Sequence, residues 1–141
     1  MEDSLKMLES KRDSLYKRLE DLGDFRRGTI GINYRKCGKS NCACAKPEHS
    51  GHGPQYLWST TIKGRSYAKS LKLGAELQKY MEETDRYRSF TKLSEQIVKV
   101  NEELCDLRPV QETEDEKEAG ELKKKMQLQF EKKRKKRLRK L

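Results

Sequence analysis

Cysteine and histidine residues crowd into one short segment of this chain. Cys37, Cys42 and Cys44 fall within eight residues, and the only two histidines, His49 and His52, follow within eight residues of Cys44. Three thiolates and one imidazole satisfy the tetrahedral geometry of structural zinc, and glycines in the segment let the backbone turn tightly enough for such ligands to meet. We expect Zn²⁺ at Cys37, Cys42, Cys44 and His52, with His49 as the alternative fourth ligand.

The same cluster bears on compartment and chemistry. An extracellular disulfide framework usually spreads its bridges along the chain, whereas three of the four cysteines here are clustered. A metal site in a reducing compartment fits this spacing, and free thiols in a loop are the alternative. A closed four-ligand site leaves no position for an activated water, and no nucleophile–base pair or glycine-rich phosphate loop is recognisable. We therefore expect no enzymatic activity. The fourth cysteine, Cys105, is expected to be a small, half-buried thiol beside a helical seam.

Two leucine-rich stripes with helical spacing flank the cluster. The first runs from Leu5 to Leu22, and the second, which lies between Gly74 and Pro109, is most regular from Phe90 to Leu107. From first to last apolar residue, the two stripes have the same length of eighteen residues. They are expected to close on each other as an antiparallel helical hairpin, and a dimerising coiled coil is the alternative.

Between the stripes the hydrophobic period changes from helical to two. The segments Ile30–Arg35, 56–62 and 65–71 alternate as strands do, and Lys63-Gly64 is suited to a two-residue hairpin turn. This turn predicts four cross-strand pairs: Ile62 with Arg65, Thr60 with Tyr67, Trp58 with Lys69 and Tyr56 with Leu71.

These patterns predict an α+β fold in which a small zinc-stabilised, three-stranded antiparallel sheet is inserted between two long antiparallel helices. Residues 1–24 form the N-terminal amphipathic helix, 25–73 the zinc-binding β module, 74–108 the second long helix, and 109–141 an acidic linker and a basic tail. The tail is expected to be disordered or only conditionally helical, because eight of its last ten residues are Lys or Arg.

Charge points to a polyanionic partner. The chain has 33 basic and 23 acidic residues, a formal net charge of +10, and its excess lies in the middle segment and in the tail. We expect contacts to nucleic acid, DNA in the first place, from three cationic groups and a mixed sheet face: Arg26, Arg27; Arg35, Lys36, Lys39; Lys132, Lys133, Arg134, Lys135, Lys136, Arg137, Arg139, Lys140; and Trp58, Arg65, Tyr67, Lys69. Alternatively, Trp58 and Tyr56 face the helices as core, and the tail is a solubility or targeting segment.

Several segments together resemble a known family. They are Phe25–Ile30, the run Tyr34-Arg35-Lys36-Cys37-Gly38-Lys39-Ser40-Asn41-Cys42-Ala43-Cys44, and His52-Gly53-Pro54 followed by Tyr56. The family consists of short uncharacterised prokaryotic proteins with a domain of unknown function, often labelled as transposases or found beside them, and the likeness covers residues 5–107. It implies His52 as the motif histidine. The sheet-then-helix order is also similar to the small DNA-contacting domains of some tyrosine recombinases, which is a fold-level analogy.

A zinc-stabilised DNA-binding accessory protein linked to a mobile element, transposase or recombinase is the function these observations favour. The alternative is a protein-interaction adaptor that uses its helical hairpin and has no direct nucleic-acid role. No apolar run approaches the ~20 residues that cross a bilayer, and the N-terminus has no signal-peptide pattern, so we expect a cytoplasmic protein without a membrane partner.

Overall fold

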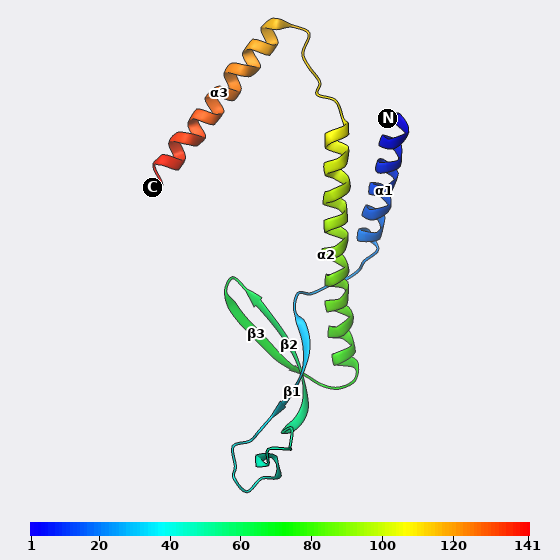
Figure 1. Ribbon diagram of the computed structural model, residues 1–141, viewed down its shortest axis with the longest axis vertical. Helices are drawn as coiled ribbons and strands as arrows, with labels where there is room; N and C mark the ends of the chain where they lie inside the picture. The colour runs from blue at the N-terminus through cyan, green and yellow to red at the C-terminus, as the bar shows by residue number, and fades with distance from the viewer. The chain divides into compact units, whose positions relative to one another are not determined.

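One long helix organises residues 1–107. The computed structural model describes residues 1–141 and divides them into two units, Met1–Leu107 and Arg108–Leu141. In the first unit helix α2 (Ala75–Leu107) runs beside both an N-terminal helix and a three-stranded sheet (Figure 1). Its 33 residues make a rod of about 50 Å at ~1.5 Å per residue. The α+β class with an open antiparallel sheet is the one the sequence predicts.

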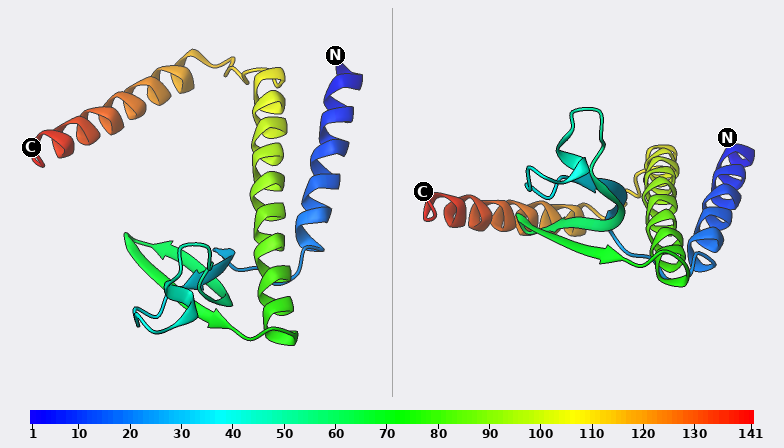
Figure 2. Two further views of the ribbon diagram at one scale, coloured as in Figure 1. Left: turned by 60° about the horizontal axis from the view of Figure 1, so that its bottom comes forward. Right: turned by 90° about the horizontal axis from the view of Figure 1, so that it is seen from below.

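Helix α1 (Glu2–Glu20) lies antiparallel to the C-terminal part of α2, as the two stripes predict (Figure 2). Their shared core is formed by Leu15, Leu93, Val100 and Leu104, which are at most 5% exposed. Further leucines of the first stripe pack at its margin. α1 ends at Glu20, so the last leucine of the predicted stripe lies in the turn beyond the helix.

The sheet contains β1 (Thr29–Arg35), β2 (His52–Ile62) and β3 (Arg65–Leu71) in that order, all antiparallel. The four predicted pairs of the β2–β3 hairpin are all confirmed. The two turn residues, Lys63 and Gly64, have φ of 50° and 77°. Positive φ at both positions is the geometry of the two-residue hairpin turn, which fixes the register.

One face of the sheet, the inner face, packs on the N-terminal part of α2. Leu71 of β3 meets Leu77 and Tyr80 of α2, and Tyr56 and Trp58 of β2 pack against this second core. Gly28 permits the close approach of the chain to the Trp58 indole, because a Cβ at this position would overlap Trp58 Nε1. The alternative in which Tyr56 and Trp58 face the helix is therefore the arrangement found.

The second unit contains helix α3 (Glu116–Leu138), which buries none of its residues. It begins inside the segment expected to be an acidic linker, and it makes most of the basic tail helical. Asp115 caps it by accepting from the backbone N–H of Lys117, and acidic residues occupy the first turn and basic residues the last. This charge order complements the helix dipole and explains why so polar a segment is helical. None of the three helices combines the length and the apolar composition needed to cross a bilayer.

Candidate metal centre

The connection between β1 and β2 brings its own two ends together. Arg35, the last residue of β1, is the register partner of His52, the first residue of β2. Gly51 makes this pairing possible, because it has a φ of +111° and a Cβ there would lie 2.9 Å from the Arg35 carbonyl carbon. Cys37, two residues beyond Arg35, is thereby placed beside His52. The sheet register thus positions half of the cluster.

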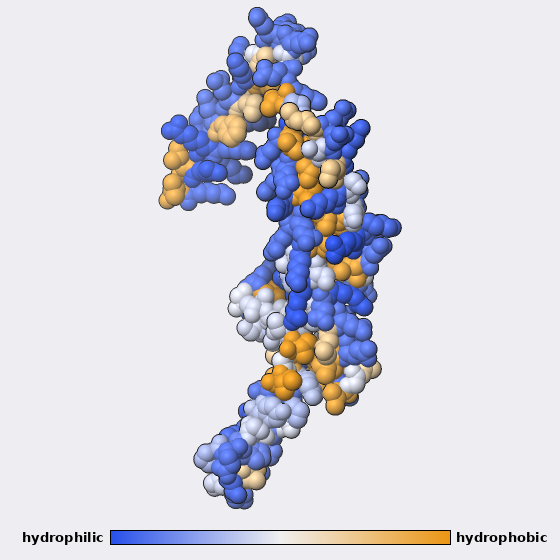
Figure 3. Space-filling view, turned by 45° about the vertical axis from the view of Figure 1, so that its right-hand side comes forward, coloured by the Kyte–Doolittle hydropathy of each residue, from blue (hydrophilic) through white to orange (hydrophobic).

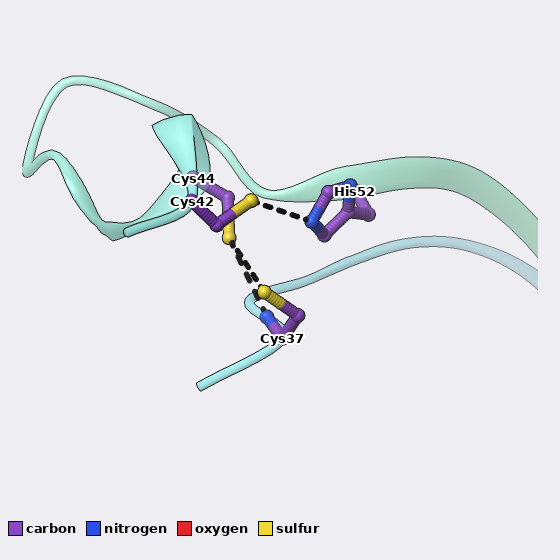
Figure 4. A group of neighbouring side chains, drawn as sticks. All are labelled: Cys37, Cys42, Cys44 and His52. Atoms are coloured by element: carbon purple, nitrogen blue, oxygen red, sulfur yellow. Dashed lines mark hydrogen bonds between the residues drawn. The ribbon is translucent and has the colours of Figure 1, made fainter. Parts of the chain in front are cut away.

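A short 3-10 turn, η1 (Ala43–Ala45), positions the other half. Cys42 precedes it, and Cys44 lies within it and is 1% exposed. In Figure 4 Cys42 points toward His52 and Cys44 toward Cys37, so ligands from both sides of the connection face a common centre. Cys37 and His52 are exposed to solvent, and Cys42 is half-buried.

The distances fit one tetrahedral ion. The Sγ atoms of Cys37 and Cys44 are 3.4 Å apart, and Cys42 Sγ lies 3.3 Å from His52 Nε2. All four ligand atoms lie within 4.8 Å of one another. Bonds of ~2.3 Å to sulfur and ~2.0 Å to nitrogen would separate two sulfurs by ~3.8 Å and sulfur from nitrogen by ~3.5 Å. Cys37, Cys42, Cys44 and His52 therefore lie close together and could bind a metal ion.

Hydrogen bonds within the protein favour ionisation of one of the thiols even without a bound metal ion. The backbone N–H of Lys39 and the side chain of His52 lower the pKa of Cys37 from 9.0 to about 6. The backbone N–H of Cys37 donates to Cys44 Sγ over 3.5 Å and favours the Cys44 thiolate, but burial and the adjacent thiols outweigh it and raise the pKa of Cys44. An incoming cation would thus meet one thiol that is ionised near neutral pH, the form that binds metals.

The two residues that the sequence left outside the ligand set have other surroundings. His49 Nδ1 accepts a hydrogen bond of 2.9 Å from the backbone N–H of Gly51, and His49 does not belong to the group that could hold an ion. Cys105 lies on α2 and is exposed, not half-buried as expected. It also stands apart from the cluster.

The cations around the metal loop, residues 36–51, are exposed to solvent. Arg35, Lys36 and Lys39 are exposed, and Lys36 Nζ donates to the carbonyl of Lys46 over 3.1 Å, across the base of the loop. Arg27, Arg65 and Tyr67, expected to contact nucleic acid as well, are also exposed. The eight cations of the tail, Lys132, Lys133, Arg134, Lys135, Lys136, Arg137, Arg139 and Lys140, are exposed in the second unit.

Arg26, Trp58 and Lys69 are instead engaged within the chain. The Arg26 guanidinium lies 3.9 Å from the centroid of the Tyr80 ring, and its Nε is 3.3 Å from Glu83 Oε1. Lys69 Nζ lies 3.1 Å from a carboxylate oxygen of Glu76 and donates to Tyr80 Oη over 3.2 Å. These hydrogen bonds raise the pKa of Lys69 and lower that of Tyr80.

Trp58 belongs to the same internal cluster. Its Nε1 donates to the carbonyl of Arg27 over 2.9 Å, and its ring stands edge-on to that of Tyr80, with centroids 5.8 Å apart. This cluster of cations, aromatic rings and carboxylates was not expected from the sequence. One signal was available: Glu83 follows Leu77 and Tyr80 at helical spacing, and an acid within an apolar stripe calls for a cationic partner.

Comparison with known proteins gives one match. A family model described as a domain of unknown function, DUF6788, matches residues 5–83, which is more than half of the chain. The matched range contains most of α1, the metal loop, all three strands and the start of α2. This agrees with the expected likeness to a family without an assigned function. No curated protein and no solved structure matches the chain.

Proposed function

Because this chain belongs to the DUF6788 family, whose function is unknown, we propose a function from the chemistry of its own residues: it is a zinc-stabilised nucleic-acid-binding protein, and its ligand is duplex DNA. The observation that carries the proposal is that the Cys/His cluster holds together a loop whose lysine side chains are exposed.

Zinc is the ion that the donor set favours. Three cysteine sulfurs and one histidine nitrogen are borderline-to-soft ligands, which select zinc over magnesium or calcium. Four protein ligands fill a tetrahedron, so the ion closes the loop and supplies no catalysis. Its role is to hold the backbone of residues 36–51 in one shape, since this segment has little core of its own.

The charge of the β module supports a polyanionic ligand. Glu48 is the one acidic residue between positions 25 and 73, whereas Arg and Lys occur at ten positions in that range. Arg26 and Lys69 are each paired with a carboxylate of α2, and the cations of the metal loop are exposed. Phosphates attract such side chains without regard to base sequence, and counterion release makes the affinity salt-dependent.

A salt titration with a charge-removal variant tests the proposal. Binding of a 20-base-pair duplex and of a single strand is measured at several salt concentrations. Each phosphate contact contributes about −0.9 to the slope of log affinity against log salt, so the double variant Lys36→Gln/Lys39→Gln should make the slope less negative by about 1.8. The matched control Lys92→Gln/Lys99→Gln, on the exposed surface of α2, should leave it unchanged. Absence of salt-dependent binding to either probe would refute the proposal.

The tail is expected to add contacts of its own. Deleting residues 132–141 removes eight cations from a helix that buries nothing, so the first unit should keep its fold and the salt slope should flatten further. An unchanged slope would assign the tail to solubility or targeting.

A second candidate, a protein-interaction adaptor, is favoured by one specific observation. Phe25 stacks on Phe90 with ring centroids 4.8 Å apart, Tyr87 lies 6.1 Å from both, and Phe25 is 43% exposed. A shallow groove continues from these rings along α2 past the exposed Val98. A transposase or recombinase is the partner we predict for such a surface. Association with a purified recombinase that survives nuclease treatment, and is lost in Phe25→Ser, would favour the adaptor.

A further inference from the structure

The sheet has a second face, here called the outer face, which is exposed and borders α2 only at an open pocket that its hairpin part shares with Tyr87 and Arg88. Its side chains alternate with those that pack on α2, and those used below are Thr29, Asn33, Gln55, Ser59, Thr61 and Ser66. All six are exposed. Leu57, half-buried, is the one large apolar side chain on this face. The sheet lies beside the N-terminal end of α2 and continues into the metal loop (Figure 1).

The outer face is polar but carries no charge, which is unusual in a chain with 40% charged residues. Hydroxyl and amide groups on it both donate and accept hydrogen bonds. In Figure 3 pale atoms of intermediate hydropathy gather beside the lower part of the helix, in contrast to the strong blue and orange of the helical region above. Cations lie at both ends of the sheet, Lys63 in the hairpin turn and Arg35 and Lys36 at the metal loop.

This combination matches what the major groove of DNA offers. The major groove is ~12 Å wide and admits a ribbon of two strands ~4.8 Å apart, so the adjacent strands β1 and β2 can enter it together. Short side chains allow a strand backbone to approach base edges, which display donors and acceptors in a different pattern for each base pair. A face that carried carboxylates would be repelled by the flanking phosphates, and this face has none.

Two amides on this face are direct neighbours. Asn33 of β1 and Gln55 of β2 are register partners, and both side chains are exposed. Asn and Gln side chains can each form two hydrogen bonds to N6 and N7 of adenine. Building on the proposed function, we infer that the outer face lies in the major groove of duplex DNA and that Asn33 and Gln55 read adenine there.

A charge placed at the centre of the outer face tests where DNA sits. Ser59→Glu puts a carboxylate on the middle strand, and Ser89→Glu makes the same change at an exposed position of α2. Ser59→Glu should weaken binding of a 20-base-pair duplex by about tenfold or more, because like charges would be brought together, and Ser89→Glu by much less. Circular dichroism and metal content establish that both variants are folded. Equal effects of the two variants would overturn the inference.

A modified probe tests the groove directly. Glucosylated 5-hydroxymethylcytosine fills the major groove and leaves the phosphates and the minor groove unchanged. Duplex with this base in place of cytosine should bind the wild-type protein about tenfold more weakly or worse. Undiminished binding, or competition by netropsin in the minor groove instead, would overturn the inference while leaving the proposed function intact. If even unmodified duplex does not bind, the proposed function itself fails.

Base reading is tested by selection from a random-sequence duplex pool. The wild-type protein should enrich sequences with adenine at fixed positions. The variant Asn33→Ala/Gln55→Ala should lose this preference by on the order of 5- to 100-fold, with its salt slope unchanged, since amides contribute no charge. The control Gln96→Ala, an exposed amide on α2, should select the same sequences as wild type. Identical enrichment by the double variant would refute the role of the two amides.

Discussion

Replacing Glu83 with glutamine tests the ion pair that fastens the segment before β1 to α2. Glu83 is 9% exposed and receives two cations, Arg26 Nε at 3.3 Å and Lys79 Nζ at 2.9 Å. The backbone N–H of Arg26 also donates to the carbonyl of Glu83 over 3.2 Å. Glutamine keeps the size of the side chain and this backbone bond but removes the charge that faces the guanidinium.

The expected loss of folding stability follows from the burial of the Glu83 carboxylate. Breaking a buried ion pair by removing one partner costs ~3–5 kcal/mol, and the remaining exposure of Arg26, 29%, lets water recover part of this, so we expect a loss of about 1–3 kcal/mol. A loss of ~2 kcal/mol in a domain of this size lowers the melting temperature by about 8–16 °C.

The effect should depend on pH in one direction. The Lys79 ammonium and then Arg26 lower the pKa of Glu83 below its ordinary value of 4.5, against the effect of burial. A carboxylate whose pKa is lowered by folding stabilises the folded state fully when the pH is above its ordinary pKa. This contribution disappears as the pH falls through the pKa of the folded state. The wild type should therefore lose its advantage over Glu83→Gln as the pH is lowered below 4.5.

Thermal unfolding followed by circular dichroism, at pH 7 and at steps below 4.5, measures both effects. The control is Glu82→Gln, which removes the neighbouring carboxylate, 53% exposed and 3.7 Å from its Arg86 partner, and should change stability by less than ~1 kcal/mol. Combining Glu83→Gln with Arg26→Gln completes a double-mutant cycle that isolates the pair. If Glu83→Gln and Glu82→Gln behave alike at pH 7, Arg26 is not held by a buried charge and our reading of the cluster is wrong.

Three further outcomes are expected. A chelator should lower the melting temperature and raise the number of rapidly reacting thiols from one, Cys105, to all four. Elemental analysis of the untreated protein should give one zinc per chain. Four reactive thiols before the chelator is added would contradict a metal site. His52→Ala should lower zinc affinity strongly and His49→Ala little, as competition with a coloured chelator would measure, because only the first lies in the cluster; the reverse order would move the fourth ligand to His49. Leu104→Ala should destabilise the α1–α2 hairpin by ~2–5 kcal/mol in denaturant unfolding, and Leu128→Ala, 58% exposed on α3, by less than ~0.5 kcal/mol; equal losses would show that the hairpin core is not where we place it.

Features fixed by local sequence rules could be predicted. The hairpin register follows from Lys63-Gly64, because two residues with positive φ leave one way to pair the flanking strands. The convergence of Cys37, Cys42 and Cys44 with a histidine follows from residue type and spacing, whereas the choice of His52 over His49 follows from the family resemblance.

Features that depend on contacts between distant parts of the chain could not be predicted from the sequence. Arg26 and Lys69 have the same sequence signature as the cations of the loop. They differ in being ion-paired, because the packing of the sheet on α2 places each opposite a carboxylate, Glu83 or Glu76. The start of α3 at Glu116 was missed because composition alone suggested a linker, whereas the cap at Asp115 and the order of charges decide the helix.

Helix α2 has two separate cores at its two ends, one shared with α1 and the other with the sheet. The two clusters share no buried apolar residue, so we expect the amide protons of the two ends to exchange with solvent at different rates. Loss of the ion would then loosen one end of the molecule while the opposite end stays protected. The proposed DNA-binding end would then open and release its ligand while the α1–α2 hairpin stays folded.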